Sequence, residues 1–355
     1  MQSINLLKIF LPSIVTFLIG IFSAPILSDF LYRNKMWKKK AKTIAPDGTG
    51  TPIFNKMHSE KETSTPRMGG VLIWFSIIST TIIFWLIAHL FSFASKVDFL
   101  SRSQTWIPIA VLLLGALIGL VDDYLDIQGR GGNLAGGLSL RKRLLLVGII
   151  AFFVSLWFYF KLDVSSIGLP FGFANLQLGW LFIPFLIIVM LAIYSGGVID
   201  GIDGLSGGIF ASIFSGYAII AFIQNQIDIS ALCAVIVGGI LAFLWFNIPP
   251  ARFYMSETGS MALTITLVVI AFMTDTVSDG HGLIALPIIA FPLLVTSASV
   301  IIQLLSKKFR GKKVFLVAPL HHHFEAIGWP ASKVTMRYWI VGIIFTLFGV
   351  IFALL

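Results

Sequence analysis

The sequence predicts an all-α integral membrane protein, and three observations support this fold class. The chain has 355 residues, of which 57% are hydrophobic and 12% are charged, with a mean hydropathy of +0.95. A soluble globular domain is roughly 25% charged. Apolar runs recur along the chain, and a helix needs about 20 such residues to cross a bilayer. The one cysteine, Cys233, lies inside an apolar run, which excludes a disulfide framework and a cysteine-based metal site.

About ten apolar runs qualify as membrane spans. In order, they are 4–30, 70–94, 107–121, 144–160, 178–199, 208–223, 229–246, 260–273, 282–305 and 335–355. The first lacks a basic leader and a small-residue cleavage site, so it predicts a span and not a signal peptide. The third and eighth are short, which indicates either a buried helix or a misplaced boundary. Residues 1–355 show no fixed repeat and no soluble segment, so we expect a single membrane domain.

The loops between the runs differ sharply in charge. Lys and Arg gather in the first, third and ninth loops, whereas the loops between them hold few. Because cytoplasmic loops are enriched in Lys and Arg, these three loops are expected in the cytoplasm and both termini outside it. The net charge of +9 is therefore explained by topology, and we expect no nucleic-acid partner.

Polar side chains with chemical capacity collect on the predicted cytoplasmic face. They are Asp122, Asp123, Asp126, Asp200, Asp203 and Glu257, together with His321, His322 and His323. Acids just past a span can simply solvate helix ends. Six carboxylates packed together would repel unless a cation lay among them, and oxygen ligands beside a phosphate substrate suit Mg²⁺. The pattern predicts an active site on the cytoplasmic face for a phosphorylated substrate, with a lipid as the second substrate.

Five motifs in a fixed order carry a resemblance to a known family. TPRMGG (65–70) resembles that family's TPTMGG, and VDDYLD (121–126) its LDDY segment. IDGIDGL (199–205) and FLWFNIPPARFYMSETGS (243–260) follow, and APLHHHFEAIGWP (318–330) is the most specific. Nearly end to end, the chain resembles the phospho-N-acetylmuramoyl-pentapeptide-transferases. These belong to the polyprenyl-phosphate N-acetylhexosamine-1-phosphate transferase superfamily.

The resemblance implies an Mg²⁺-dependent enzyme with ten spans and both termini outside, in the bacterial inner membrane. It would move phospho-MurNAc-pentapeptide from UDP-MurNAc-pentapeptide to undecaprenyl phosphate and release UMP. This is the first membrane step of peptidoglycan synthesis, and it ties the enzyme to cell shape and cell division. Members of the family often form dimers, so a homodimer is expected.

The resemblance also assigns expected roles to individual residues. Asp122, Asp123, His321 and His322 are expected to be catalytic, and Glu257 with Asp122 to hold Mg²⁺. Substrate binding is expected at Lys61, Thr65, Arg143, Asp200, Asp203, Asn247, Tyr254 and His323. Each basic or glycine-rich segment also has a structural explanation, since Arg143 obeys the topology rule and the glycines can form a flexible loop.

The chain departs from the family pattern at several of these positions. Glu257 replaces an aspartate, Tyr254 another aromatic residue, Gly197 an asparagine and Asp126 a lysine. An inactive homologue is therefore one alternative. A second is a related transferase that uses UDP-GlcNAc, which the HHHFE segment disfavours. A third is an ion-coupled transporter, which would hold its ionisable groups near the bilayer midplane and not at span ends.

Overall fold

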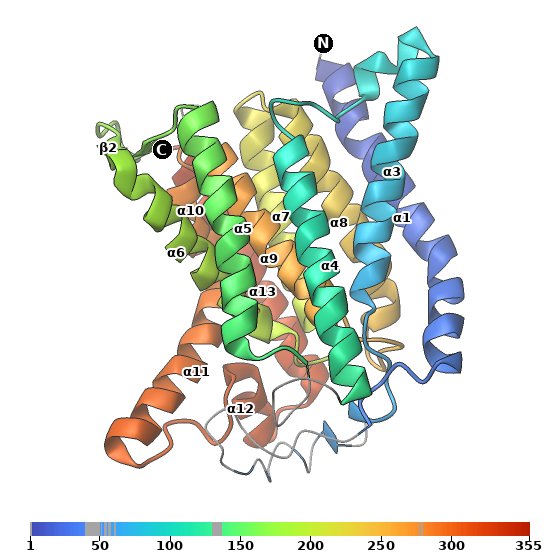
Figure 1. The fold of residues 1–355 in the computed structure, drawn as a ribbon, viewed down its shortest axis with the longest axis vertical. Coiled ribbons are helices and arrows are strands. Elements are labelled where there is room, and N and C mark those ends of the chain that lie inside the picture. The colour runs from blue at the N-terminus through green and yellow to red at the C-terminus, as the bar shows by residue number, and fades with distance from the viewer. Residues whose placement is uncertain are drawn as a thin grey trace.

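A computed structural model describes residues 2–39, 50, 52, 55, 58–59, 62–129, 137–275, 277 and 280–355. Most of the described chain forms long helices that run side by side (Figure 1). They are α1 (Gln2–Arg33), α3 (Gly70–Leu90), α4 (Trp106–Gln128), α5 (Leu140–Lys161), α6 (Phe182–Tyr194), α7 (Leu205–Ile223), α8 (Ile227–Asn247), α9 (Ser256–Met273), α10 (Gly282–Ile289), α11 (Phe291–Arg310), α12 (Leu320–Ala326) and α13 (Ala331–Ala353). Short 3-10 segments are η1 (Ser92–Val97), η2 (Gly179–Leu181) and η3 (Ser195–Ile199).

The expected number of spans agrees with the helices. Among the described residues, nine helical stretches are long and apolar enough to cross a membrane. The pair α10 and α11 is bent by 62° and makes a tenth if it forms one broken span. Pro287 lies inside α10 and Pro292 at the start of α11, and proline removes the amide donor that a continuous helix needs. The prediction of a multi-pass helical membrane protein is therefore confirmed.

The two short runs have different explanations. The third was a misplaced boundary, because α4 continues through Gln128 and carries Asp122, Asp123 and Asp126 in its last two turns. The eighth is the buried helix α9, in which every residue except Glu257 is buried. A helix surrounded by protein does not need an unbroken apolar surface, so its run of apolar residues is short.

Helix α9 forms the axis of the bundle, and α4 packs closely along it. At Gly119 of α4, an added Cβ would collide with the backbone of Glu257 and Thr258 in the first turn of α9. This close approach brings the carboxylates at the end of α4 to the start of α9.

The opposite end of the bundle carries a small antiparallel sheet, in which Ser166 of β1 (Ser166–Ile167) pairs with Gln177 of β2 (Leu176–Gln177). Both chain ends lie toward this upper end in Figure 1, whereas α12 and the end of α4 lie at the lower end. The predicted site residues therefore gather at the end away from the termini.

Candidate active site

Asp123 joins α4 to the first turn of α9. One carboxylate oxygen accepts hydrogen bonds from the amide and the hydroxyl of Thr258, at 2.8 and 2.6 Å. The other lies 3.4 Å from the amide of Glu257 and 3.5 Å from Nε of Arg67. The first amides of a helix lack intrahelical partners, so a carboxylate stabilises that end. Asp123 is fully buried, and these bonds are those of a group that fixes the position of α9.

Glu257, Asp122 and Arg143 meet where α9, α4 and α5 converge. Arg143 forms an ion pair with Oε1 of Glu257, and its Nη1 lies 3.7 Å from Oδ2 of Asp122. The hydroxyl of Tyr194 donates to Oε2 of Glu257 at 3.5 Å, and the amide of Leu138 donates to Oδ1 of Asp122 at 2.6 Å. The structure therefore brings together both residues expected to hold Mg²⁺, with Arg143 between them.

The donor chemistry of this group fits a divalent cation. The carboxylates of Asp122 and Glu257 come from different helices and flank one position, which the positively charged guanidinium of Arg143 occupies. Nearly a quarter of the Glu257 side chain is exposed, at 23%, so a phosphate ligand could reach the same point. Magnesium usually takes one or two carboxylates and completes its shell with water and phosphate oxygens. Asp122 and Glu257 are such a pair.

A second charged network lies beside the first and was not predicted. Arg67 Nη1 lies 2.9 Å from Oδ2 of Asp126, and Lys38 Nζ lies 3.6 Å from the same oxygen and 3.5 Å from Glu62. Burial alone would lower the pKa of Arg67, but the carboxylates of Asp126 and Asp123 outweigh burial and raise that pKa above its usual value. Burial, together with Arg67, lowers the pKa of Lys38. The available signal was Arg67 itself, a charged residue inside TPRMGG.

The loop between η3 and α7 holds Asp200 and Asp203. Asp200 accepts hydrogen bonds from the hydroxyl of Ser206 and the amide of Ser256, both at 2.7 Å, and burial raises its pKa. Asp203 accepts from the amide of Ala251 at 3.3 Å. Both acids therefore tie this loop to neighbouring segments of the site.

Asn247 and Tyr254 flank the same loop but differ in how far their side chains are exposed to a ligand. The side-chain oxygen of Asn247 accepts from Gly204, and its amide donates to the carbonyl of Phe253, each at 2.9 Å. Because Asn247 is 1% exposed and bonded at both ends, its expected contact with a nucleotide stays a prediction. Tyr254 is partly exposed and hydrogen-bonds to Thr65, and burial raises its pKa to about 12. The structure thus joins Thr65 to Tyr254, while Lys61 lies outside the described residues.

The three histidines begin α12 and face different surroundings. His321 is fully buried, and within the described residues neither of its ring nitrogens has a hydrogen-bond partner. The nitrogen Nδ1 of His323 accepts from the amide of Leu316 at 3.2 Å, so it contacts its own loop. An added Cβ on Gly201 would approach Nε2 of both His321 and His322, at 2.9 Å for His322. Only glycine lets the Asp200 loop lie this close to the histidines.

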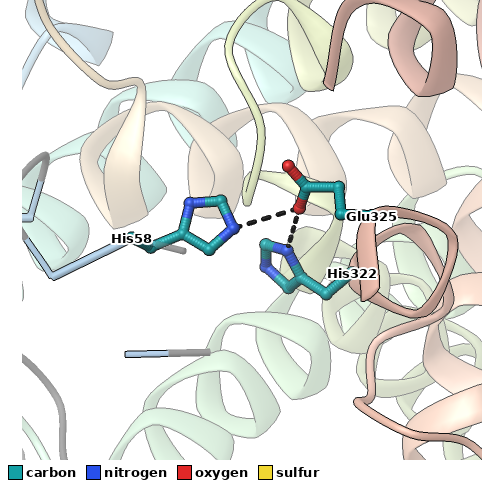
Figure 2. Close-up of side chains that lie close together, drawn as sticks. All are labelled: His58, His322 and Glu325. Carbon is teal, nitrogen blue, oxygen red and sulfur yellow. Dashed lines mark hydrogen bonds and ion pairs between the residues drawn. The ribbon is translucent and has the colours of Figure 1, made fainter. Parts of the chain in front are cut away.

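His322 belongs to a cluster that also includes His58 and Glu325 (Figure 2). Nδ1 of His322 lies 2.7 Å from Oε2 of Glu325, and Nε2 of His58 lies 3.0 Å from the same oxygen. His58 precedes α3, so the cluster joins segments 267 residues apart. Burial lowers the pKa of His322, although its bond to Glu325 acts in the opposite direction. Sequence reasoning missed both partners, although the spacing of three residues between His322 and Glu325 on one helix was an available signal. His58, a lone histidine, carried none.

Known proteins resemble this chain over nearly its whole length. Residues 105–275 match the family described as Glycosyl transferase family 4. The phospho-N-acetylmuramoyl-pentapeptide-transferase of Bacillus licheniformis is 34% identical over 340 residues, which cover 95% of each chain. The chain belongs to the phospho-N-acetylmuramoyl-pentapeptide-transferase family. The protein of the same name from Bacillus subtilis is 33% identical over 341 residues, 94% of each chain. The resemblance seen in the motifs is thereby confirmed.

Two departures from the transferase family pattern are partners in the structure. Arg67 stands where the family's TPTMGG motif has threonine, and Asp126 stands where the family has lysine. These two residues form the 2.9 Å ion pair at the end of α4. Arg67, from the loop before α3, thus places one positive charge beside both Asp123 and Asp126. Gly197, a third departure, lies on η3 against Ser260 of α9, where a Cβ would make ordinary contact at 3.5 Å.

Proposed function

We propose that this protein transfers phospho-MurNAc-pentapeptide from UDP-MurNAc-pentapeptide to undecaprenyl phosphate. The products are undecaprenyl-pyrophosphoryl-MurNAc-pentapeptide and UMP, and the step is the first membrane reaction of peptidoglycan synthesis. The observation that carries the proposal is the convergence of Asp122, Glu257 and Arg143 at one end of the bundle, in a chain that belongs to this transferase family.

Nucleotide binding is assigned to the loop between η3 and α7 and the segments around it. Tyr254 is partly exposed and offers an aromatic face on which uracil can stack. Thr65 holds the Tyr254 hydroxyl. Asp200 and Asp203 shape the loop through their bonds to backbone amides. Asn247 fixes the loop by accepting a hydrogen bond from the amide of Gly204. In this arrangement the two acids position the pocket, and Tyr254 makes the contact with the base.

The diphosphate is assigned to the space beside Arg143. Asp122 and Glu257 would hold Mg²⁺, which offsets the negative charge of the diphosphate and stabilises the departing UMP. Arg143 can turn from the carboxylates to the phosphate oxygens, for which a guanidinium has matching geometry. Asp123 keeps the first turn of α9 in place, and with it the carboxylate of Glu257.

The attacking atom is a phosphate oxygen of the lipid. It forms a bond to the phosphorus next to the sugar, while the bond from that phosphorus to the bridging oxygen breaks and UMP leaves with the oxygen. A dianionic lipid phosphate needs no base. If it arrives with one proton, Asp122 or a neutral histidine of α12 takes that proton.

The lipid substrate is supported by an apolar cavity of about 290 Å³ beside α12. Its wall includes Phe291 of α11, Leu320 and Phe324 of α12, and Tyr338 of α13. Leu320 directly precedes His321, so an apolar chain in this cavity would end close to the histidines. The basic loops next to this end support a cytoplasmic active site, with both termini outside the cytoplasm of a bacterial inner membrane. A homodimer stays a prediction.

The test is a reaction with purified protein in detergent, undecaprenyl phosphate and Mg²⁺, in which UMP release is measured. We expect UMP from UDP-MurNAc-pentapeptide and none from UDP-GlcNAc. Glu257→Gln should abolish turnover, whereas the control Asp29→Asn, which changes an exposed carboxylate on α1, should not. UMP release from UDP-GlcNAc alone would assign the protein to the related transferases, and no release from either would reject both activities.

A further inference from the structure

Glu325 receives two imidazoles on a single oxygen atom. His322 approaches Oε2 through Nδ1 at 2.7 Å, and His58 approaches it through Nε2 at 3.0 Å. The two rings contact each other edge to face, with centroids 4.8 Å apart. The side chains of Glu325 and His322 are 9% and 5% exposed, so water competes little for these bonds. Figure 2 shows both bonds converging on the carboxylate.

The charge state of Glu325 determines where the protons lie. Burial alone would raise the pKa of Glu325, but the bonds from His322 and His58 outweigh it and lower that pKa to about 2. An ionised carboxylate can only accept hydrogen bonds. Nδ1 of His322 and Nε2 of His58 must therefore both carry hydrogen. In a neutral His322 ring, the second nitrogen, Nε2, is then an acceptor.

Nε2 of His322 lies on the side of the proposed nucleotide loop. A Cβ on Gly201 would stand 2.9 Å from this nitrogen, and Gly201 separates Asp200 from Ile202 in the loop. A carboxylate that fixes one ring nitrogen also fixes the orientation of the other, as it does in many histidine sites. Without Glu325, Nδ1 of His322 would lose the hydrogen bond that sets the tautomer.

The same three residues could be taken for a metal site, since their ligand atoms lie within 4.8 Å of one another. The distances disfavour it. Donor atoms around a tetrahedral metal, each about 2.0–2.2 Å from the ion, stand roughly 3.3 Å apart. Here the two nitrogens lie 2.7 and 3.0 Å from the carboxylate oxygen, which are hydrogen-bond lengths.

We propose that Glu325 is a positioning residue that holds His322 in the Nδ1–H tautomer, so that Nε2 is presented as an acceptor toward the loop at Gly201. His58 completes the arrangement by binding the segment before α3 to the same carboxylate. The substrate that Nε2 meets follows from the proposed function, but the tautomer does not depend on it.

The direct test is nitrogen NMR on protein labelled with ¹⁵N-histidine, in which the chain's six histidines keep the spectrum simple. We expect His322, assigned through His322→Gln, to show the Nδ1–H pattern in the wild-type protein. Glu325→Ala should give mixed tautomers. The control Asp29→Asn changes an exposed carboxylate on α1, and it should leave the pattern unchanged. An Nε2–H pattern in the wild-type protein would overturn the proposal.

Kinetics supply the second readout. We expect Glu325→Ala to lower kcat about tenfold with little change in KM for the UDP substrate, because the loss affects the reacting geometry more than binding. Glu325→Gln keeps an acceptor oxygen and should retain more activity than Glu325→Ala. Normal kcat in Glu325→Ala, despite mixed tautomers, would remove the positioning role. Tight Zn²⁺ binding that shifts the signals of both His58 and His322 would replace it with a metal site.

Discussion

The ion pair between Arg67 and Asp126 makes a quantitative prediction about two departures from the family pattern. Their charged atoms lie 2.9 Å apart, and the side chains are 20% and 9% exposed. At an effective dielectric constant of about 20, Coulomb's law gives about 6 kcal/mol of attraction at this separation. Desolvation of two mostly buried charges cancels the larger part, which leaves a net contribution of about 2 kcal/mol.

The perturbation replaces each residue by the one that the family carries. Arg67→Thr removes the pair but leaves Lys38 beside Asp126, so we expect a loss of about 2 kcal/mol. Asp126→Lys removes the pair and brings a third cation next to Arg67 and Lys38, so the loss should be about 4 kcal/mol. In the double variant, the new lysine no longer faces Arg67. The loss of unfolding free energy in the double variant should therefore be smaller than the sum of the two single losses by about 3 kcal/mol.

The assay is reversible unfolding in mixed detergent micelles, followed by tryptophan fluorescence. The pair Asp29 and Arg33 is the control, because its separation of 2.8 Å is similar but its side chains are 56% and 77% exposed. There we expect a coupling of less than about 1 kcal/mol. If the losses at Arg67 and Asp126 added to within about 0.5 kcal/mol, the two departures would be independent and the reasoning refuted.

Three further results are expected. Glu257→Asp should stay active in the UMP assay while Glu257→Gln does not, and equal activity of the two would exclude a charge requirement at this position. Tyr254→Ala should raise KM for the UDP substrate by more than it lowers kcat, whereas an unchanged KM would place the uracil elsewhere. His321 has a pKa well below its usual value because it is buried, so the unfolded chain binds the extra proton below about pH 6.5. Stability measured by unfolding should therefore fall by about 1.4 kcal/mol per pH unit below that point, and His321→Gln should flatten this slope.

The general architecture could be predicted from sequence because bilayer thickness sets the length of an apolar run. The exceptions were segments where protein and not lipid surrounds the helix. The run of α4 ended too early in the prediction because Asp122 and Asp123 have partners within the protein and so continue the helix. The run of α9 was short because Ser260 and Thr264 need no lipid contact.

The candidate site could be predicted only as a set of residue types on one face. The grouping of Asp122, Glu257 and Arg143 follows from helix ends that the charge pattern places on the same side. The bond from Thr258 to Asp123 could not be predicted, because it depends on how far α9 lies from α4. His58 was missed for the same reason: its partner Glu325 is distant in sequence, and only the folded chain brings them together.

The two residues of the Arg143–Glu257 ion pair belong to helices with different surroundings. In α9, which carries Glu257, 94% of the membrane-spanning residues are buried within the protein, whereas in α5, which carries Arg143, only 33% are, which leaves most of α5 open to contact with lipid. A helix in contact with acyl chains adjusts its tilt when the hydrophobic thickness changes, whereas a helix sheathed by others does not. Bilayer thickness should therefore act on this site through α5, by moving the arginine along a carboxylate that stays in place. Lipids of graded chain length, compared in nanodiscs, would then change turnover while leaving the fold of α9 unaltered.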